Sequence, residues 1–492
     1  MHMGKSNPKF IFIKGALWSL GTRWAIKLAG FLNTVIMARL LMPSDYGIVA
    51  MSMLVVEATH TFTDVGAETA VLRIEKPTRD EVDSAWTLRL FQNIFVGLFV
   101  VAIAPLAAGY FKEPRVEPVL FVFAACMCIY GLTNIGLTLA HKEFNFSVFF
   151  RVSVYSKVLS VLTTLVAGVI LKDYRALVIG IASGYISGAV LSYVMHPYRP
   201  KINKTKIKEI WEITKWLMLT SMGGFLLRRS DEIIASKIAV ARDYGIYHVG
   251  ADLGRLPVSE MGPVMMRAFL PVLSSMQGDM KRTNAAVLKT LSAINVITIP
   301  VGLGISAIAV PLTEMVLGEK WLEAVPFVAI YAVVAAVQFI VSPLATLLVL
   351  KGHTKVQSFA IWIEFAFFVA FIALLIPGYG LLGLAVARLA ASVVNIIVIV
   401  FLAKKYCSIN VLEVVISIAR PLLGSLFMGF MVFEFVSASQ NSIYFQVFVG
   451  AGLGAVFYSF WTCLTWMLLK KPEGLESTVY DFLKQYRKNI FS

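Results

Sequence analysis

Long apolar runs separated by short polar loops recur from one end of the chain to the other. Each run has about 20 residues or more, which is the length that an α-helix needs to cross a bilayer. The runs are continuous rather than alternating, so they predict about fourteen membrane-spanning helices and not a β-barrel. The predicted spans cover residues 11–38, 46–68, 84–109, 117–140, 146–171, 176–196, 214–238, 244–267, 285–310, 322–350, 355–376, 380–403, 415–437 and 443–469. This pattern predicts an all-α, multi-pass membrane protein.

The composition agrees with this prediction and limits the partners. Hydrophobic residues make up 58% of the chain, charged residues 15%, and the mean hydropathy is +0.77. The net charge of +15 lies largely in short loops, where the positive-inside rule places Lys and Arg on the cytoplasmic side. We therefore expect no nucleic acid partner. An even number of spans places both termini in the cytoplasm.

The first span carries two cations near its middle, Arg23 and Lys27. Residues four apart lie on one helical face, so both side chains point the same way. Each costs roughly 2.5–3.5 kcal/mol on insertion scales, because lipid offers no counter-ion. An internal salt bridge or snorkelling to the interface would explain them structurally. The functional interpretation is a cationic lining for an anionic substrate that crosses the membrane.

The second span carries an acidic stripe that complements these cations. Its members, at spacings of three, four and four residues, are Glu57, His60, Asp64 and Glu68. His60 can titrate near neutral pH, and a carboxylate in a low dielectric can carry a proton. These groups, with Asp252 of a later span, are candidates for coupling to H⁺ or Na⁺. Asp64 and Glu68 could equally be solvated helix ends.

The notable residues of the third to sixth spans mostly point to structural roles and not to a binding site. Thr78 and Glu81 have the spacing of a capping box that opens the third span. Arg89 lies in the first turns of that span, and we expect it to snorkel. Lys157 lies deep in the fifth span, where it could line a cavity or form a structural pair.

The seventh and eighth spans are again rich in charge. The seventh contains Arg228, Arg229, Asp231 and Glu232, and the eighth contains His248, Asp252, Arg255 and Ser259 on one stripe. Arg228 has favourable helical spacing to Asp231 and to Glu232. Asp231 and Asp252 are therefore candidate charge partners, and Arg228 and Arg255 are candidate ligands for an anion.

An internal repeat explains why the charges gather in the first two and in the seventh and eighth spans. Residues 36–48 align with residues 234–246 at an offset of 198, and both segments contain Asp-Tyr-Gly-Ile. In each copy the Asp, Asp45 or Asp243, is expected to cap the following helix. The repeats enter the membrane from the same side. Equivalent charged helices in two parallel halves predict one central cavity and alternating access.

Motifs for other chemistry are missing from the sequence. We find no GxxxxGK[ST], HExxH or GxSxG segment, so we expect neither an enzyme nor a cofactor. The expected organisation is an N-lobe (1–196), a basic cytoplasmic linker (197–213), a C-lobe (214–403), two further helices (404–469) and a cytoplasmic tail (470–492).

Several ordered segments resemble one family of exporters. They are GALW (15–18), FTDVGAETAVLR (62–73), PVMMRAFLPVLSSMQGD (263–279), GEKW (318–321), LLVLKGHTK (347–355) and the repeated DYG turn. Together they look like Wzx-type polysaccharide flippases of the colanic-acid, or polysaccharide-synthase, branch of the MOP exporter superfamily. The resemblance implies a MATE-like, V-shaped bundle of two six-helix lobes plus two extra C-terminal helices.

The resemblance also implies a substrate and a location. It implies a multi-pass protein of the bacterial inner membrane that translocates undecaprenyl-pyrophosphate-linked oligosaccharide for surface polysaccharide biosynthesis. A polysaccharide polymerase and a chain-length regulator are implied partners besides membrane lipid. Cationic cavity residues would engage the pyrophosphate, and the positions here are Arg23, Lys27, Arg228 and Arg255, with Asn33 near the sugar.

Two other functions stay open on the sequence. A MATE-like multidrug/cation antiporter would share the fold, but its site should be acidic, which the Arg23/Lys27 pair opposes. A membrane glycosyltransferase, polymerase or ligase would need a large external loop or a nucleotide-sugar site, and no loop here is long enough.

Overall fold

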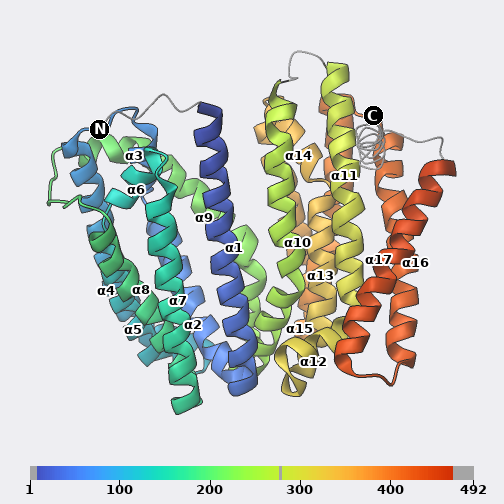
Figure 1. The fold of residues 1–492 in the computed structure, drawn as a ribbon, viewed down its shortest axis with the longest axis horizontal. Helices are drawn as coiled ribbons and strands as arrows, with labels where there is room; N and C mark the ends of the chain where they lie inside the picture. Colours follow the sequence, from blue (N-terminus) through green and yellow to red (C-terminus); the bar gives the residue numbers. More distant parts are fainter. Residues whose placement is uncertain (1–7, 276–279, 469–492) are drawn as a thin grey trace, which may run out of the picture. The chain divides into compact units, whose positions relative to one another are not determined.

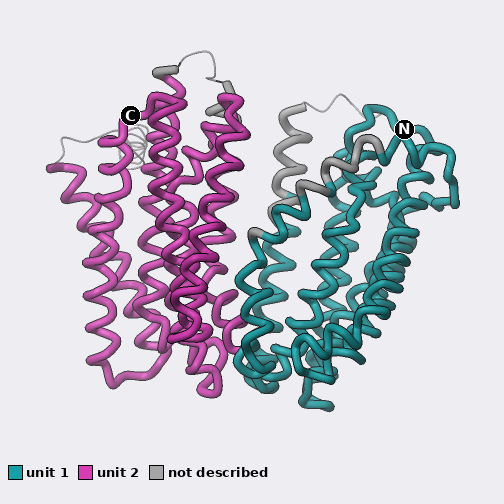
Figure 2. The backbone as a smooth tube through the Cα atoms, turned by 180° about the vertical axis from the view of Figure 1, so that it is seen from behind, with its two compact units in different colours: residues 1–245 teal, residues 246–492 magenta. Residues whose placement is uncertain are grey.

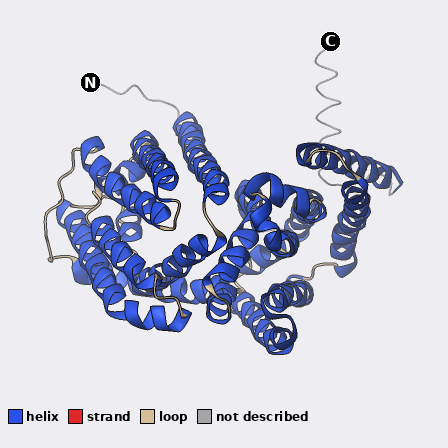
Figure 3. Ribbon diagram, turned by 90° about the horizontal axis from the view of Figure 1, so that it is seen from below, coloured by secondary structure: helices blue, strands red, loops and turns tan. Residues whose placement is uncertain are grey.

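The computed structural model describes residues 8–275 and 280–468, and every regular element within them is helical (Figure 3). Two compact units divide the chain at residues 245 and 246 (Figure 2). The predicted tail, residues 470–492, lies outside the described residues.

Unit 1 contains nine helices and the first turn of a tenth in its described residues (Figure 1). They are α1 (Pro8–Leu40), α2 (Pro43–Thr63), α3 (Ala67–Arg73), α4 (Arg79–Phe111), α5 (Val116–Gly131), α6 (Gly136–Lys142), α7 (Phe146–Leu171), α8 (Arg175–Met195), α9 (Ile207–Ile238) and the start of α10 (Ala241–Ser275). Helix α9 packs against α2, α3 and α4 and therefore belongs to this unit.

Unit 2 contains the rest of α10 and the helices that follow it. They are α11 (Met280–Ala307), α12 (Ala309–Leu317), the 3₁₀ turn η1 (Glu319–Ala324), α13 (Val325–Ile340), α14 (Ser342–Leu350), α15 (Thr354–Cys407), α16 (Val411–Ala438) and α17 (Ile443–Leu468). One apolar core joins α11, α14 and the second half of α15, with Leu291, Leu344 and Ala403 fully buried in it.

Eight helices in the described part of the chain are long and apolar enough to cross a membrane. Two bent helix pairs, α2 with α3 and α5 with α6, would raise this number to ten. Helices α1, α9 and α10 are not among them, and these three carry many of the charges singled out from the sequence. The chain is thus an all-helical, multi-pass membrane protein.

Helix α15 is two helices joined at a break. Gly380 has φ +53° and ψ −129°, and Pro377 precedes it by three residues. A left-handed φ favours glycine because a Cβ would clash there. Beyond the break, a Cβ on Gly383 would lie 2.4 Å from the Leu375 carbonyl oxygen, so the chain turns back on itself. The sequence placed a boundary between predicted spans at this point.

Two predicted helix caps are present in unit 1. The Thr78 amide donates to Glu81 Oε2 at 2.7 Å, and the Glu81 amide donates to Thr78 Oγ1 at 3.4 Å, which confirms the capping box. Asp45 lies in the first turn of α2 and accepts from the Met42 amide at 2.9 Å. Its other oxygen accepts from the Tyr174 amide at 3.2 Å, so this cap also holds the turn before α8.

The bends at α2–α3 and α5–α6 are held by polar side chains. Asp64 Oδ1 accepts from the Gly66 amide at 2.9 Å and so stabilises the first bend. Arg89 donates to Glu68 of α3 at 2.6 Å and to the Thr133 carbonyl in the second bend. The Arg89 side chain is only 7% exposed. The expectation that Arg89 snorkels is therefore wrong, because its side chain is buried in unit 1, where it pairs with the partly exposed Glu68.

Candidate functional site

Helices α1 and α7 run side by side in the same direction, and this brings intramembrane cations together. Trp18 contacts Phe150 near one end, with ring centroids 4.8 Å apart, and Met37 contacts Gly168 near the other. Between these contacts the Lys157 ammonium lies 3.7 Å from the point where a Cβ on Gly30 would stand. The absence of a side chain at Gly30 leaves space for the lysine.

Lys27 lies one turn before Gly30, on the same face of α1. Because the Lys157 ammonium lies beside Gly30, the two lysines are neighbours on adjacent helices. Lys27 is exposed, whereas Lys157 and Arg23 are half-buried. We call Lys27 and Lys157 the lysine pair. Two like charges on neighbouring helices repel each other, and an anion bound between them would relieve that repulsion.

Asn33 lies further along α1 and is half-buried. Its side-chain oxygen has no hydrogen-bond donor among the described residues. A ligand hydroxyl could donate to this oxygen, because an amide oxygen accepts hydrogen bonds.

Arg229 of α9 links two carboxylates, and we call these three residues the Arg229 clamp. Its Nη2 lies 3.0 Å from Glu57 Oε2 of α2, and its Nη1 lies 2.5 Å from Glu232 Oε1. The Nε also donates to the second Glu57 oxygen at 3.4 Å, which completes a forked contact. With one guanidinium and two carboxylates, the clamp has an excess of negative charge.

The sequence indicated the charges of the clamp but not their pairing. The partner of Glu232 is Arg229 rather than the predicted Arg228, which is exposed and lies over Gly224. Asp231 is fully buried. The spacing of three residues between Arg229 and Glu232 was the available signal, but spacing alone did not distinguish the two arginines.

The remaining members of the acidic stripe have other partners. The His60 ring packs edge-on against Tyr130 of α5, with centroids 6.0 Å apart, and Tyr130 packs in the same way against Tyr185 of α8. Glu68 binds Arg89, and Asp64 binds backbone at the bend. Only Glu57 of this stripe therefore meets an arginine of α9.

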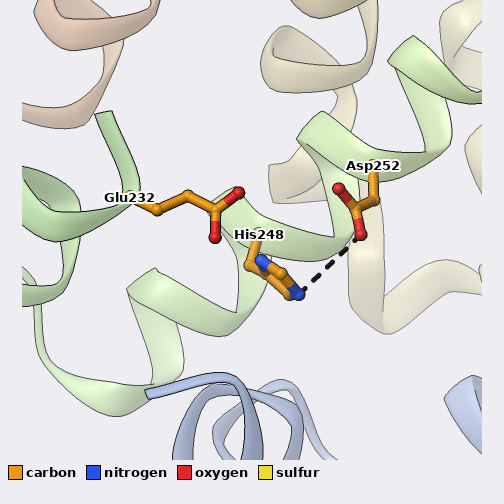
Figure 4. A group of neighbouring side chains, drawn as sticks. All are labelled: Glu232, His248 and Asp252. Carbon is orange, nitrogen blue, oxygen red and sulfur yellow. Dashed lines mark ion pairs between the residues drawn. The ribbon is translucent and has the colours of Figure 1, made fainter. Parts of the chain in front are cut away.

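Unit 2 contributes two polar pairs from α10. His248 Nε2 points toward Asp252 Oδ2 at 3.8 Å, and the Asp252 side chain is 58% exposed (Figure 4). The Arg255 guanidinium lies 4.0 Å above the centre of the Tyr331 ring. The Tyr331 hydroxyl is hydrogen-bonded to Tyr247, which fixes the ring under the arginine.

The family of the chain follows from a match to a sequence model. Residues 36–326, more than half of the chain, match the model described as "Polysaccharide biosynthesis protein". The chain belongs to this family. The matched range contains both copies of the repeat and the Arg229 clamp, and Arg23 and Lys27 lie before it.

Two relatives have low sequence identity to this chain but align along most of its length. The lipopolysaccharide biosynthesis protein WzxC of Escherichia coli (strain K12) is 20% identical over 404 residues, 80% of this chain and 81% of that protein. The succinoglycan biosynthesis transport protein ExoT of Rhizobium meliloti (strain 1021) is 22% identical over 462 residues, 91% of this chain and 92% of that protein.

Solved structures share the fold of this polysaccharide biosynthesis protein. The lipid II flippase MurJ in an inward closed conformation matches with a TM-score of 0.70 and 14% identity, over 92% of this chain and 99% of that one. An inward-facing multidrug resistance MATE transporter of the MOP superfamily matches with a TM-score of 0.58 and 14% identity, over 78% and 94%. The fold expected from the resemblance, that of the MOP superfamily, is thus confirmed.

Proposed function

We propose that this protein is a flippase for a lipid-linked oligosaccharide whose link is a pyrophosphate. The substrate would be an undecaprenyl-pyrophosphate-linked repeat unit of a surface polysaccharide. It would be translocated across the bacterial inner membrane by alternating access. The family assignment, the distant relatives in polysaccharide biosynthesis and the MurJ-like fold support this proposal.

The single observation that carries the proposal is the lysine pair. Lys27 and Lys157 lie on neighbouring helices, with Arg23 one turn away on the face of Lys27. A charged headgroup does not cross hydrocarbon unaided, and ammonium groups bind phosphate oxygens as point charges. The sugar would occupy the hydrated part of the cavity, where Asn33 offers an acceptor, and the prenyl tail would remain in lipid.

The proposed topology has fourteen spans and both termini in the cytoplasm. The eight apolar helices, the two bent pairs and the three charged helices account for thirteen, and the break at Gly380 divides α15 into two. Fourteen is the number expected from the sequence, and it would require α1, α9 and α10 to span the membrane as well. The charged helices α1, α9 and α10 would then supply most of the intramembrane ligands.

Ion coupling is the second part of the proposal. Glu57 in the Arg229 clamp and Asp252 beside His248 are carboxylates on charged helices, and each already has a basic partner. A proton or Na⁺ that neutralised either carboxylate would weaken the contact to that partner. We therefore propose that a gradient of H⁺ or Na⁺ drives transport. His60 and Asp231 are proposed as further charged groups that take part in this coupling.

One observation favours the alternative of a multidrug/cation antiporter. The Arg229 clamp has an excess of negative charge, and a MATE transporter shares the fold. An organic cation could bind there if the lysine pair had another role.

Purified protein in liposomes distinguishes the two functions. The liposomes contain a fluorescent lipid-linked oligosaccharide, and an impermeant reagent reports the fraction exposed in the outer leaflet. We expect exposure well above that of protein-free liposomes, and no gradient-driven uptake of a cationic dye in parallel vesicles. Dye uptake without oligosaccharide movement would contradict the flippase and support the antiporter.

A further inference from the structure

A strap of residues 196–206 connects α8 to α9 along one end of unit 1. Its backbone is fixed to the first turns of α4 by three hydrogen bonds to buried side chains. The Lys201 amide donates to Asp83 Oδ1 at 3.2 Å, the Asn203 amide to Thr87 Oγ1 at 2.9 Å and the Lys206 amide to Ser84 Oγ at 3.2 Å. All three acceptor residues are at most 4% exposed. The strap is therefore a built part of the unit.

Tyr198 adds two further contacts to the strap. Its hydroxyl donates to Asp83 Oδ1 at 2.7 Å, and its carbonyl accepts from Asn134 Nδ2 at 2.7 Å. These bonds tie the strap both to α4 and to the α5–α6 bend. Because the backbone is held at both ends, its side chains project from fixed positions.

Those side chains are cationic and point outward. Arg199, Lys201 and Lys204 are exposed, and Ile202 between the two lysines is 66% exposed. Exposed apolar side chains beside cations are typical of a segment at the membrane–water interface.

Two contacts place these cations at the end of exposed apolar surfaces on two candidate membrane spans. The Lys204 ammonium lies 5.5 Å from the centre of the Phe91 ring, and Phe91 begins an exposed apolar stripe on α4 that continues with Phe95 and Leu98. The Arg199 guanidinium lies 5.7 Å from the centre of the Tyr193 ring on α8. On α8 the neighbouring Val190 and Val194 are 56% and 72% exposed. Both stripes thus end beneath a cation of the strap.

We propose that Arg199, Lys201 and Lys204 of the strap form a binding site for the phosphate headgroup of anionic phospholipids. The acyl chains would follow the exposed stripes of α4 and α8, and Ile202 would enter the boundary between headgroups and chains. Each cation is attracted to an anionic membrane surface, so three cations on a fixed backbone select phosphatidylglycerol over phosphatidylcholine. This site lies outside the lysine pair and does not depend on the proposed function.

The test compares lipid-induced stabilisation of the purified, full-length protein in neutral detergent. The unfolding midpoint is measured with added phosphatidylglycerol, with phosphatidylcholine or with inorganic phosphate alone. The variant is Arg199→Gln/Lys201→Gln/Lys204→Gln. The matched control is Lys112→Gln/Lys172→Gln/Arg175→Gln, three exposed cations of the same unit at the opposite ends of α4 and α8.

We expect phosphatidylglycerol to raise the midpoint of the wild type and the control more than phosphatidylcholine does. The strap variant should require about 10- to 100-fold more phosphatidylglycerol for the same rise. An equal response of strap variant and wild type would overturn the site, and an equal effect of inorganic phosphate would overturn the lipid as its occupant. If the triple variant fails to fold, Lys204→Gln is compared with Lys204→Arg, which keeps the charge. A weaker rise of the midpoint with phosphatidylglycerol in Lys204→Gln alone supports the site, and equal rises in both variants contradict it.

Discussion

Gly47 and Gly245 each pack against the backbone of the other's helix. A Cβ on Gly47 would lie 1.7 Å from the Ala241 carbonyl oxygen, and a Cβ on Gly245 would lie 2.0 Å from the Pro43 carbonyl oxygen. Gly245 and Ala241 follow Gly47 and Pro43 by the repeat offset of 198 residues. The two copies of Asp-Tyr-Gly therefore meet in a reciprocal contact in which each uses the same surface.

The first prediction concerns these glycines. Gly47→Ala or Gly245→Ala should destabilise the protein by about 1–3 kcal/mol, because backbone atoms must move to admit a methyl group. Gly109→Ala is the matched control, since nothing lies within 4 Å of its Cβ position. The measurement is the unfolding midpoint in detergent. Wild-type midpoints for both variants would show that α2 and α10 do not cross at this contact.

Features that depend on residues close together in the chain were predictable from the sequence, and contacts between distant segments were not. The Thr78–Glu81 capping box and the break near Gly380 were predicted, because both depend on residues close together in the chain. The repeat itself was also visible. Its contact across Gly47 and Gly245 was not, because which surfaces of two helices meet depends on tertiary packing that no local pattern contains.

For the charged residues, too, the local pattern was predictable and the tertiary contacts were not. Their stripes were predicted from helical spacing, whereas their partners were not. Arg89 was expected to reach toward water, but Glu68, which lies 21 residues earlier in the chain, holds it inside unit 1. The strap was predicted as a basic linker, and its cations are indeed exposed; its fixation by Asp83 depends on a residue 118 positions before Lys201.

The second prediction separates the two adjacent arginines of α9. Arg229→Ala removes the partner of Glu232, whose side chain is only 5% exposed, and should destabilise the protein by about 3–5 kcal/mol. Arg228→Ala removes an exposed side chain and should change stability by less than about 0.5 kcal/mol. Unfolding of both variants in the same detergent measures the difference. Equal effects of the two substitutions would contradict the clamp.

The same pair of variants also tests the proposed ligands. Because Arg228 is a proposed substrate contact, Arg228→Ala should slow oligosaccharide flipping while the protein stays folded. Flipping at the wild-type rate would remove Arg228 from the site and leave the stability result unchanged.

The third prediction concerns pH and His196, which follows the last residue of α8. Its Nδ1 accepts a hydrogen bond from the Tyr198 amide at 3.2 Å, and it packs against Gly136. Partial burial lowers the pKa of His196, and nearby Glu143 opposes this shift. The unfolded chain therefore binds the proton more readily than the folded protein. The stabilisation by neutral His196 is present above about pH 6.5 and is lost as the pH falls below that value toward the folded-state pKa.

The measurement is the unfolding midpoint between about pH 7.5 and pH 5.5, the range in which histidine titrates. The midpoint of the wild type should fall with pH, and His196→Gln should reduce this dependence. His141→Gln, at an exposed histidine of the same unit, is the matched control. A pH dependence that is the same in all three proteins would exclude His196 as its source.

The lysine pair is tested by leaflet exposure of a labelled lipid-linked oligosaccharide in liposomes containing the purified protein. Lys27→Ala, Lys157→Ala and Arg23→Ala should each slow flipping by about 10- to 100-fold, the loss expected for one charged hydrogen bond to phosphate. Membrane abundance and the unfolding midpoint should stay near those of the wild type. Flipping at the wild-type rate in both lysine variants would contradict the account, because the proposed pyrophosphate site would then have no role in transport.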